Sequence, residues 1–409
     1  MSIEREVAPE QAGFDARRLA RLDAHFARYV DDGRLAGWQL AIARDGRVVH
    51  SSVHGHRDAE HALPVEPDTL WRLYSMTKPV TSVAAMMLWE EGRFELTDPI
   101  AEYLPEFSTM RVYDKGSASQ PYTVPAAEPI RVWHLLTHTS GLTYGFLHTS
   151  VVDALYRKAG YELTMKPGAD LAEASRDFAA LPLLFQPGTA WGYGVSTDVL
   201  GRLVEVVAGM PLPEFIRTRI LEPLGMRDTS WSVPRDEKRL AALYVPGPDG
   251  RRLRYDALGD LAFEEPTAPA GGGGLISCAA DYQKFMTMLL NRGAVEGGER
   301  LLASRTVAFM TRNHLPGGAD LDTLQTGGFA ETTFEGVGFG LGFAVVRDPV
   351  PARVFSSPGS YYWGGAASTA FWVDPVERLT VAFYTQLVPS STYPIRPQLR
   401  QLIYTAMTD

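Results

Sequence analysis

The chain has 409 residues, of which 45% are hydrophobic and 21% are charged, which is the composition of a large globular protein. The formal net charge is -9 and no run rich in Lys or Arg occurs, which argues against nucleic-acid binding. The single cysteine, Cys278, excludes an intrachain disulfide and fits a reducing compartment.

Segments that would direct the chain to a membrane are missing from the sequence as given. The first residues are charged and lack the apolar core of a signal peptide. No apolar stretch is long enough to cross a bilayer. We therefore expect a cytoplasmic protein without a membrane span, and the oligomeric state is left open.

The first hundred residues predict a helix, a hairpin and a second helix. Apolar residues at helical spacing predict a helix over 14–32, with Asp15 as its N-cap. Two β-rich runs, 38–43 and 48–53, flank Asp45-Gly46, which is a strong hairpin signal. Residues 76–92 are apolar almost all round and predict a buried helix.

The middle of the chain reads as mainly helical, with Pro- and Gly-rich interruptions. Residues 117–129 are poor in apolar side chains and predict a surface loop. A helix is expected over 195–207, ending near Gly209. After a run of four glycines, residues 281–291 predict another amphipathic helix.

Strand patterns return near the C-terminus, over 339–346, 370–373 and 380–385, and 397–407 predicts a closing helix. Strands at both ends with helices between them indicate an α/β (α+β) fold. We expect one antiparallel sheet built from N- and C-terminal strands, flanked by helices, with an inserted helical region. The chain would be one unit, 1–409, with a sheet lobe (1–99 plus 262–409) and a helical lobe (100–261).

Ser75 and Lys78 form the sequence Ser75-Met76-Thr77-Lys78 at the start of the predicted buried helix. Residues three apart lie on one helix face, so the hydroxyl and the amine can meet. A serine hydroxyl needs its proton removed before it attacks, and a desolvated lysine can help because, unlike arginine, it can lose its charge. The spacing alone is weak, since a solvated Lys one turn after a Ser is common.

Two further motifs stand far along the chain. Tyr193, in Trp191-Gly192-Tyr193-Gly194, precedes a predicted helix, and a nearby ammonium would favour its phenolate. Trp363-Gly364-Gly365 comes just before a predicted strand, where two glycines let a backbone or a ligand approach closely. Each motif also has an ordinary structural reading, as a packing tyrosine and as a tight turn.

Taken in order, these motifs resemble the serine β-lactamase and penicillin-binding-protein-like superfamily, most closely its esterase branch, the family VIII carboxylesterases. The resemblance covers about residues 15–405. Supporting matches are His134-Leu135-Leu136-Thr137-His138-Thr139-Ser140-Gly141-Leu142, Gln186-Pro187-Gly188, Leu221-Glu222-Pro223-Leu224-Gly225-Met226 and Gly272-Gly273-Gly274-Leu275.

The resemblance implies a mechanism. Ser75 would attack an ester carbonyl, and Lys78 and Tyr193 would share the role of general base. The backbone N–H groups of Ser75 and Ala366 would bind the oxyanion, and water would resolve the acyl-enzyme. No metal or other cofactor is implied, and the expected partner is a small ester.

Departures from the β-lactamase pattern bear on the substrate. The Tyr-x-Asn motif reads Tyr193-Gly194-Val195 here, and Val195 cannot bond a substrate amide. Trp363 and Gly364 replace the Lys and Thr of Lys-Thr-Gly, so the cation that would hold a substrate carboxylate is lost. We expect a preference for neutral, short- to medium-chain esters.

The walls of the pocket are less specific in the sequence. The resemblance places Trp363, Gly364 and Gly365 at the substrate. Tyr144 and Phe146 follow the His138–Leu142 motif and are candidates for the entrance, as are Tyr361 and Tyr362. Loop packing explains these aromatic residues equally well.

Other activities stay open or are set aside. The motif Gly-x-Ser-x-Gly is absent, which disfavours an α/β-hydrolase. His134 and His138 are four apart but lack His-Glu-x-x-His, and the glycine run lacks Gly-Lys-Ser/Thr, so metal and nucleotide binding are not expected. The alternatives are a D-amino-acid peptidase, β-lactamase or amide hydrolase, an acyltransferase with the same acyl-enzyme, and a non-catalytic binding module.

Overall fold

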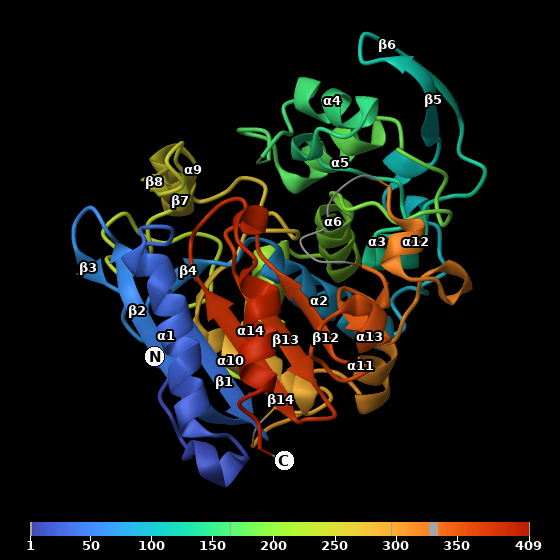
Figure 1. Cartoon of the computed structure of the whole chain (residues 1–409). Coiled ribbons are helices and arrows are strands. Elements are labelled where there is room, and N and C mark those ends of the chain that lie inside the picture. The colour runs from blue at the N-terminus through green and yellow to red at the C-terminus, as the bar shows by residue number, and fades with distance from the viewer. Residues whose placement is uncertain (1, 164, 296, 327–333, 409) are drawn as a thin grey trace.

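An eight-stranded antiparallel sheet forms the centre of the molecule, in the order β10-β11-β12-β13-β14-β1-β2-β3 (Figure 1). The computed structural model describes residues 2–163, 165–295, 297–326 and 334–408. The strands are β1 (Gly37–Arg44), β2 (Arg47–Asp58), β3 (Leu63–Pro64), β10 (Val337–Phe339), β11 (Ala344–Val346), β12 (Tyr361–Gly364), β13 (Ala370–Asp374) and β14 (Leu379–Tyr384). Gln39 of β1 pairs with Tyr384 of β14, so both ends of the chain share one sheet, as predicted.

Side chains alternate along each strand, so both faces of this sheet carry apolar residues. Helices cover both faces and bury these residues. Trp38, Leu40 and Ile42 pack against α1 (Ala16–Asp31) and α14 (Ile395–Tyr404), which lie in front of the sheet in Figure 1. Ala41 and Ala43 belong to the core on the other face. There α10 (Ala279–Leu290) contacts β13, β14 and β1.

The N-terminal predictions are confirmed in detail. The Asp15 carboxylate accepts hydrogen bonds from the backbone N–H groups of Arg17 and Arg18, so it caps α1. Asp45 and Gly46 both have positive φ, at 53° and 77°, and they join β1 to β2. Positive φ at both central residues is what a two-residue hairpin turn requires.

Helix α2 (Lys78–Glu90) packs against α6 (Ser196–Ala208) in the helical part of the chain. α6 ends at Gly209, whose φ of 71° caps the helix as the sequence predicts. The other helices are α3 (Val132–Thr137), α4 (Val151–Lys158), α5 (Leu171–Ala179), α7 (Leu212–Ile216), α8 (Glu222–Leu224), α9 (Asp256–Gly259), α11 (Ser304–Met310), α12 (Leu321–Leu324) and α13 (Pro349–Ala352).

The expectation of a mainly helical section over about 100–260 misses two pairs of strands, and a third short pair lies outside that section. β5 (Arg111–Ser117) and β6 (Gln120–Pro125) form a hairpin where 117–129 was predicted to be a loop. Its strands are exposed on most of their length, so they lack the apolar alternation that marks a half-buried strand. Two short pairs, β7 (Tyr244–Pro246) with β8 (Arg252–Arg254) and β4 (Leu70–Arg72) with β9 (Ile276–Cys278), also lie outside the large sheet.

One C-terminal prediction needs correction. The strand expected over 339–346 is two strands, β10 and β11, because Gly342 adopts a φ of 99° and turns the chain back. Trp363 and Gly364 precede β13, as predicted, and they also form the end of β12, where they pair with Phe371 and Ala370 of β13. The division into two lobes stays a prediction. No helix in the described ranges is long and apolar enough to cross a membrane.

Candidate active site

Ser75 and Lys78 lie at the junction between a 3₁₀ turn, Tyr74–Thr77, and the first residue of α2. A 3₁₀ turn has three residues, so side chains at i and i+3 are nearly eclipsed. Accordingly, Lys78 Nζ is 3.3 Å from Ser75 Oγ. The preceding residue, Tyr74, has a φ of 47°, an uncommon conformation for an aromatic residue that turns the chain sharply from β4 into the helix.

The amine of Lys78 is buried and held by several oxygen atoms. Nζ donates to the Tyr144 hydroxyl at 2.9 Å and to the Gly272 carbonyl at 2.6 Å. It also lies 4.7 Å from the centre of the Tyr193 ring. These contacts fix the amine between Ser75 and the two tyrosines, within reach of the serine proton.

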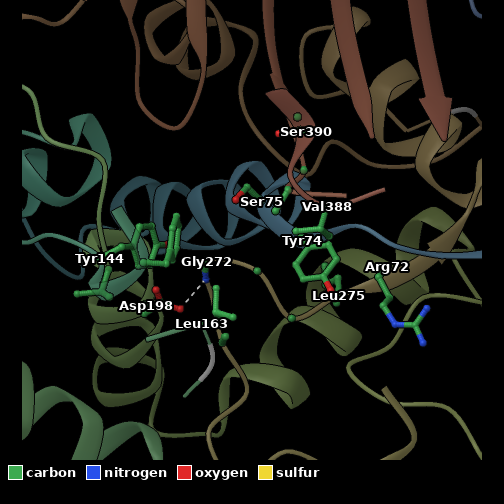
Figure 2. Close-up of a pocket in the computed structure, with 18 of the residues that line it drawn as sticks. Arg72, Tyr74, Ser75, Tyr144, Leu163, Asp198, Gly272, Leu275, Val388 and Ser390 are labelled. Carbon is green, nitrogen blue, oxygen red and sulfur yellow. Dashed lines mark hydrogen bonds between the residues drawn. The ribbon is translucent and has the colours of Figure 1, made fainter. Parts of the chain in front are cut away.

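The carboxyl group of Asp198 supports the Gly272 side of this arrangement, as Figure 2 shows. It accepts a hydrogen bond from the Gly272 N–H at 2.9 Å. Burial raises the pKa of Asp198, while the positive charge of Lys78 opposes this rise. A Cβ added to Gly272 would meet the Asp198 carboxyl at 2.7 Å, so a larger residue at this position would displace that carboxyl.

Tyr193 stands in a cluster of aromatic rings beside Lys78. Its oxygen accepts a hydrogen bond from the indole N–H of Trp363 at 3.2 Å. Trp191 stacks on it with ring centres 6.1 Å apart, and the His138 ring centre is 5.0 Å away. Burial, and after it the charge of Lys78, lowers the pKa of His138 well below its usual value, so this imidazole is neutral.

The two glycines after Trp363 allow the backbone to approach its neighbours closely. A Cβ on Gly365 would collide with the Leu73 carbonyl, and one on Gly364 would collide with the guanidinium of Arg396. β12 can therefore pass directly beside the residues that precede Ser75. This is the close approach for which two consecutive glycines are suited.

The two backbone amides that the sequence predicts as an oxyanion site are those of Ser75 and Ala366. Ser75 lies in the first turn of its helix, where N–H groups have no partner within the helix. Ser368 N–H donates to the Gly365 carbonyl at 3.1 Å, which closes a turn, and Ala366 is the second residue of that turn. The hydrogen bond that closes this turn comes from the amide of its fourth residue, Ser368, and does not use the amide of Ala366.

A cavity of about 860 Å³ opens above these groups. Ser75, Tyr144, Phe146 and Tyr193 line it, and so do residues 363–366. In Figure 2 the Tyr144 ring lies on one side of Ser75 and the Tyr74 ring on the other. The volume is in the range of cavities that hold drug-sized molecules.

The structure thus brings together every site residue that the sequence singles out, with one correction at the entrance. Tyr362 lines the cavity, whereas Tyr361 is 1% exposed and packs on Phe343 in the core. Strand alternation places neighbouring side chains on opposite faces, which explains the difference.

Several site residues were not predicted. Gly272 was named only as part of a matching motif and was given no role, yet its carbonyl accepts a hydrogen bond from Lys78. Asp198 and Arg396 carry no local motif at all. The four-glycine run was the available signal, because glycines that pack on α6 mark a close approach of two backbones: a Cβ on Gly271 would lie 2.8 Å from the Thr197 carbonyl.

No group of three His, Cys, Asp or Glu side chains that could hold a metal ion occurs among the residues that the structure describes. The buried Cys278, at the end of β9, has its pKa raised to about 11, chiefly by burial, so its thiol is protonated at neutral pH.

This fold and this site define the class of serine hydrolases with a β-lactamase-like architecture. The chain belongs to the Beta-lactamase family, which it matches over residues 22–405. Esterase EstB from Burkholderia gladioli is 32% identical over 416 residues, covering 97% of this chain and 98% of that protein. Lovastatin esterase from Penicillium rubens is 28% identical over 372 residues, covering 86% of this chain and 89% of that protein.

A solved structure, EstCE1, a hydrolase with promiscuous acyltransferase activity, has a TM-score of 0.80 and 27% identity. The match covers 95% of this chain and 98% of EstCE1. These findings confirm the resemblance and the fold predicted from the motifs. The protein is a serine hydrolase of this family.

Proposed function

We propose that the protein is a carboxylesterase that hydrolyses short- to medium-chain, mainly neutral esters through an acyl-enzyme on Ser75. The observation that carries the proposal is the 3.3 Å contact between Ser75 Oγ and Lys78 Nζ at the floor of a largely apolar cavity. A hydroxyl beside a fixed, buried amine is the arrangement of an activated nucleophile.

In the first half of the reaction, Ser75 Oγ forms a bond to the ester carbonyl carbon while its proton passes to the Lys78 and Tyr193 pair. The oxyanion accepts hydrogen bonds from the Ser75 and Ala366 amides, each worth about 3–4 kcal/mol of barrier. The carbon–oxygen bond to the alcohol then breaks, and the alcohol leaves with the stored proton. Water repeats these steps on the acyl-enzyme and frees the acid.

The preference for neutral esters rests on Trp363 and Val195. Trp363 presents an indole face where the related lactamases hold a carboxylate with lysine. Arg396 brings a cation close to the cavity, but its Nη2 donates to the carbonyls of Gly365 at 3.2 Å and Thr369 at 3.0 Å. Val195 lines the cavity and offers no hydrogen bond to an amide.

The test is the hydrolysis of p-nitrophenyl butyrate by wild type and Ser75→Ala, prepared side by side. We expect turnover by wild type and background rates for the variant. Equal rates in both would exclude Ser75 as the nucleophile. A kcat/KM for a penicillin above that for the butyrate ester would overturn the neutral-ester preference in favour of a lactamase or peptidase.

Acyl transfer is a second candidate, favoured by the size of the cavity, since about 860 Å³ is far more than a butyryl group fills. EstCE1 is described as combining hydrolysis with acyl transfer, which supports the same option here. Product analysis with a competing alcohol distinguishes them. Ester formed in excess of free acid would make transfer the main reaction, and free acid alone would exclude it.

A further inference from the structure

Tyr74, the residue before Ser75, presents an open hydroxyl group to the cavity. The side chain is half-buried and lines the cavity. Its hydroxyl has no hydrogen-bond partner among the residues that the structure describes, and its oxygen is not enclosed by protein atoms. Burial raises the pKa of Tyr74 to about 12, so the hydroxyl keeps its proton at neutral pH and can donate it in a hydrogen bond.

A buried cation close to Tyr74 favours an acceptor oxygen at this hydroxyl. Arg72 is 7% exposed, and its charge opposes the rise in the pKa of Tyr74. Within the described ranges, its guanidinium donates to neutral oxygen atoms only, which are the carbonyls of Gly259 and Ala241 and the side-chain amide of Gln386. The charge is therefore not neutralised by a contacting carboxylate. The resulting positive potential attracts the negative end of a substrate dipole.

The position of the amine indicates which part of the ester faces Tyr74. The groups that take the Ser75 proton return it to the leaving alcohol, so the alcohol lies on the side of Lys78. Tyr144 marks that side, because its hydroxyl accepts a hydrogen bond from Lys78 Nζ at 2.9 Å. Figure 2 shows the rings of Tyr144 and Tyr74 on opposite sides of Ser75. The acyl chain therefore extends toward Tyr74.

The acyl side of the cavity is otherwise mainly apolar. Leu258 and Leu261, on either side of Gly259, line the same cavity. A purely aliphatic acyl chain would pack against such residues, but it would also cover the Tyr74 hydroxyl without offering it a partner. A polar group that loses water and gains no hydrogen bond lowers affinity, whereas a chain with a matching oxygen avoids this loss.

We propose that Tyr74 is a specificity-determining residue whose hydroxyl donates a hydrogen bond to an oxygen atom carried on the acyl chain. The inference rests on the proposed function and narrows its substrate class. The favoured substrates are esters of acids that bear a neutral acceptor oxygen, such as an ether or a ketone, some bonds away from the ester carbonyl. Tyr74 keeps its proton throughout, so the chemistry at Ser75 is unchanged.

Two variants and three esters test this. Tyr74→Phe removes the hydroxyl and keeps the ring. Tyr161→Phe is the matched control, because Tyr161 also lines the cavity but its hydroxyl already donates to Asp177 at 2.8 Å. The substrates are p-nitrophenyl hexanoate and two ether analogues of the same chain length, the 3-ethoxypropanoate and the 4-methoxybutanoate, in which one oxygen replaces a methylene group.

The measurement is the ratio of kcat/KM for each ether ester to kcat/KM for the hexanoate. We expect Tyr74→Phe to lower this ratio about fivefold for at least one ether ester, which is the net effect of one hydrogen bond. Tyr161→Phe should leave the ratio unchanged. An unchanged ratio for both ether esters in Tyr74→Phe would overturn the proposal, and so would an equal change in Tyr161→Phe.

A second pair of esters tests the side of the cavity. Hexyl butyrate and 3-ethoxypropyl butyrate place the same ether oxygen on the alcohol in place of the acyl chain. Release of butyric acid measures their hydrolysis. We expect Tyr74→Phe to leave the ratio of these two rates unchanged. A fivefold change in this pair, with none in the acyl series, would overturn the assignment of Tyr74 to the acyl chain.

A third readout does not depend on catalysis. Dissociation constants of the hexanoate and its ether analogues are measured by calorimetry with Ser75→Ala, and with the same variant carrying Tyr74→Phe. We expect the preference for an ether ester to be about fivefold smaller in the double variant. If wild type cleaves none of the esters, the proposed function fails while these constants still decide the inference. Equal preferences in the two proteins, or no binding of any ester, would overturn it.

Discussion

The floor and the walls of the cavity are built in different ways. Lys78, Tyr193 and Trp363, which surround Ser75 at the floor, are 2%, 3% and 7% exposed and are fixed by hydrogen bonds. At the rim, the side chains of Leu163 and Leu261 are apolar and are 57% and 43% exposed, so packing restrains them less. Packing and hydrogen bonds thus fix the catalytic residues at the floor, whereas the less restrained side chains at the rim are expected to determine substrate selectivity.

Removing the amine from the floor should have the largest effect. Lys78→Met keeps the length of the side chain and should lower kcat/KM by about 10³-fold, since general base catalysis is typically worth about 10²–10⁴-fold. Steady-state kinetics on p-nitrophenyl butyrate measure this. Lys284→Met is the control, because Lys284 binds Asp281 and the Gly225 carbonyl away from the cavity. An equal loss in both would mean that the effect is on folding.

Adding one carbon to the floor should have the next largest effect. In Gly365→Ala the new Cβ meets the Leu73 carbonyl, so the backbone beside Ser75 must shift. We expect kcat to fall about 10²-fold, as for a displaced oxyanion donor, with little change in KM. A thermal unfolding curve should also move to lower temperature. Wild-type kcat would show that the Ala366 amide does not take part.

Loosening the amine without removing it should cost less. Tyr144→Phe deletes the hydroxyl that accepts the 2.9 Å bond from Lys78 Nζ and should lower kcat/KM about tenfold. Because burial holds the pKa of Tyr144 well above its usual value, the hydroxyl is neutral at assay pH. In Tyr144→Phe, kcat/KM should therefore fall by a similar factor at every pH, and the pH profile should keep both of its limbs. Loss of a limb would make Tyr144 a titrating base.

Changes at the rim should have the smallest effect and should depend on the substrate. Leu163→Ala removes part of a half-exposed apolar surface, worth about 1 kcal/mol or fivefold in KM for a long acyl chain. The comparison of p-nitrophenyl acetate with the octanoate measures it, and only the octanoate should change. An equal change in KM for both esters would mean that Leu163 supports the catalytic residues and does not contact the acyl chain.

Short-range features of the chain were predictable. The Asp15 cap, the Asp45-Gly46 turn and the Ser75–Lys78 pair each depend on residues a few positions apart, and the structure places them as expected. The β5–β6 hairpin was missed because its strands are exposed and lack the alternation that identifies a strand. Tyr361 was misplaced because an apolar aromatic residue gives no sign of which face it takes.

The sequence by itself determined the family, the sheet shared by the chain ends, and the set of motifs that meet at Ser75. Only the tertiary structure decided which atoms meet. The Gly272 carbonyl reaches Lys78 across 194 positions, and the Trp363 indole reaches Tyr193 across 170. Local spacing carries no information about such contacts, because they exist only after the sheet and α6 have packed around α2.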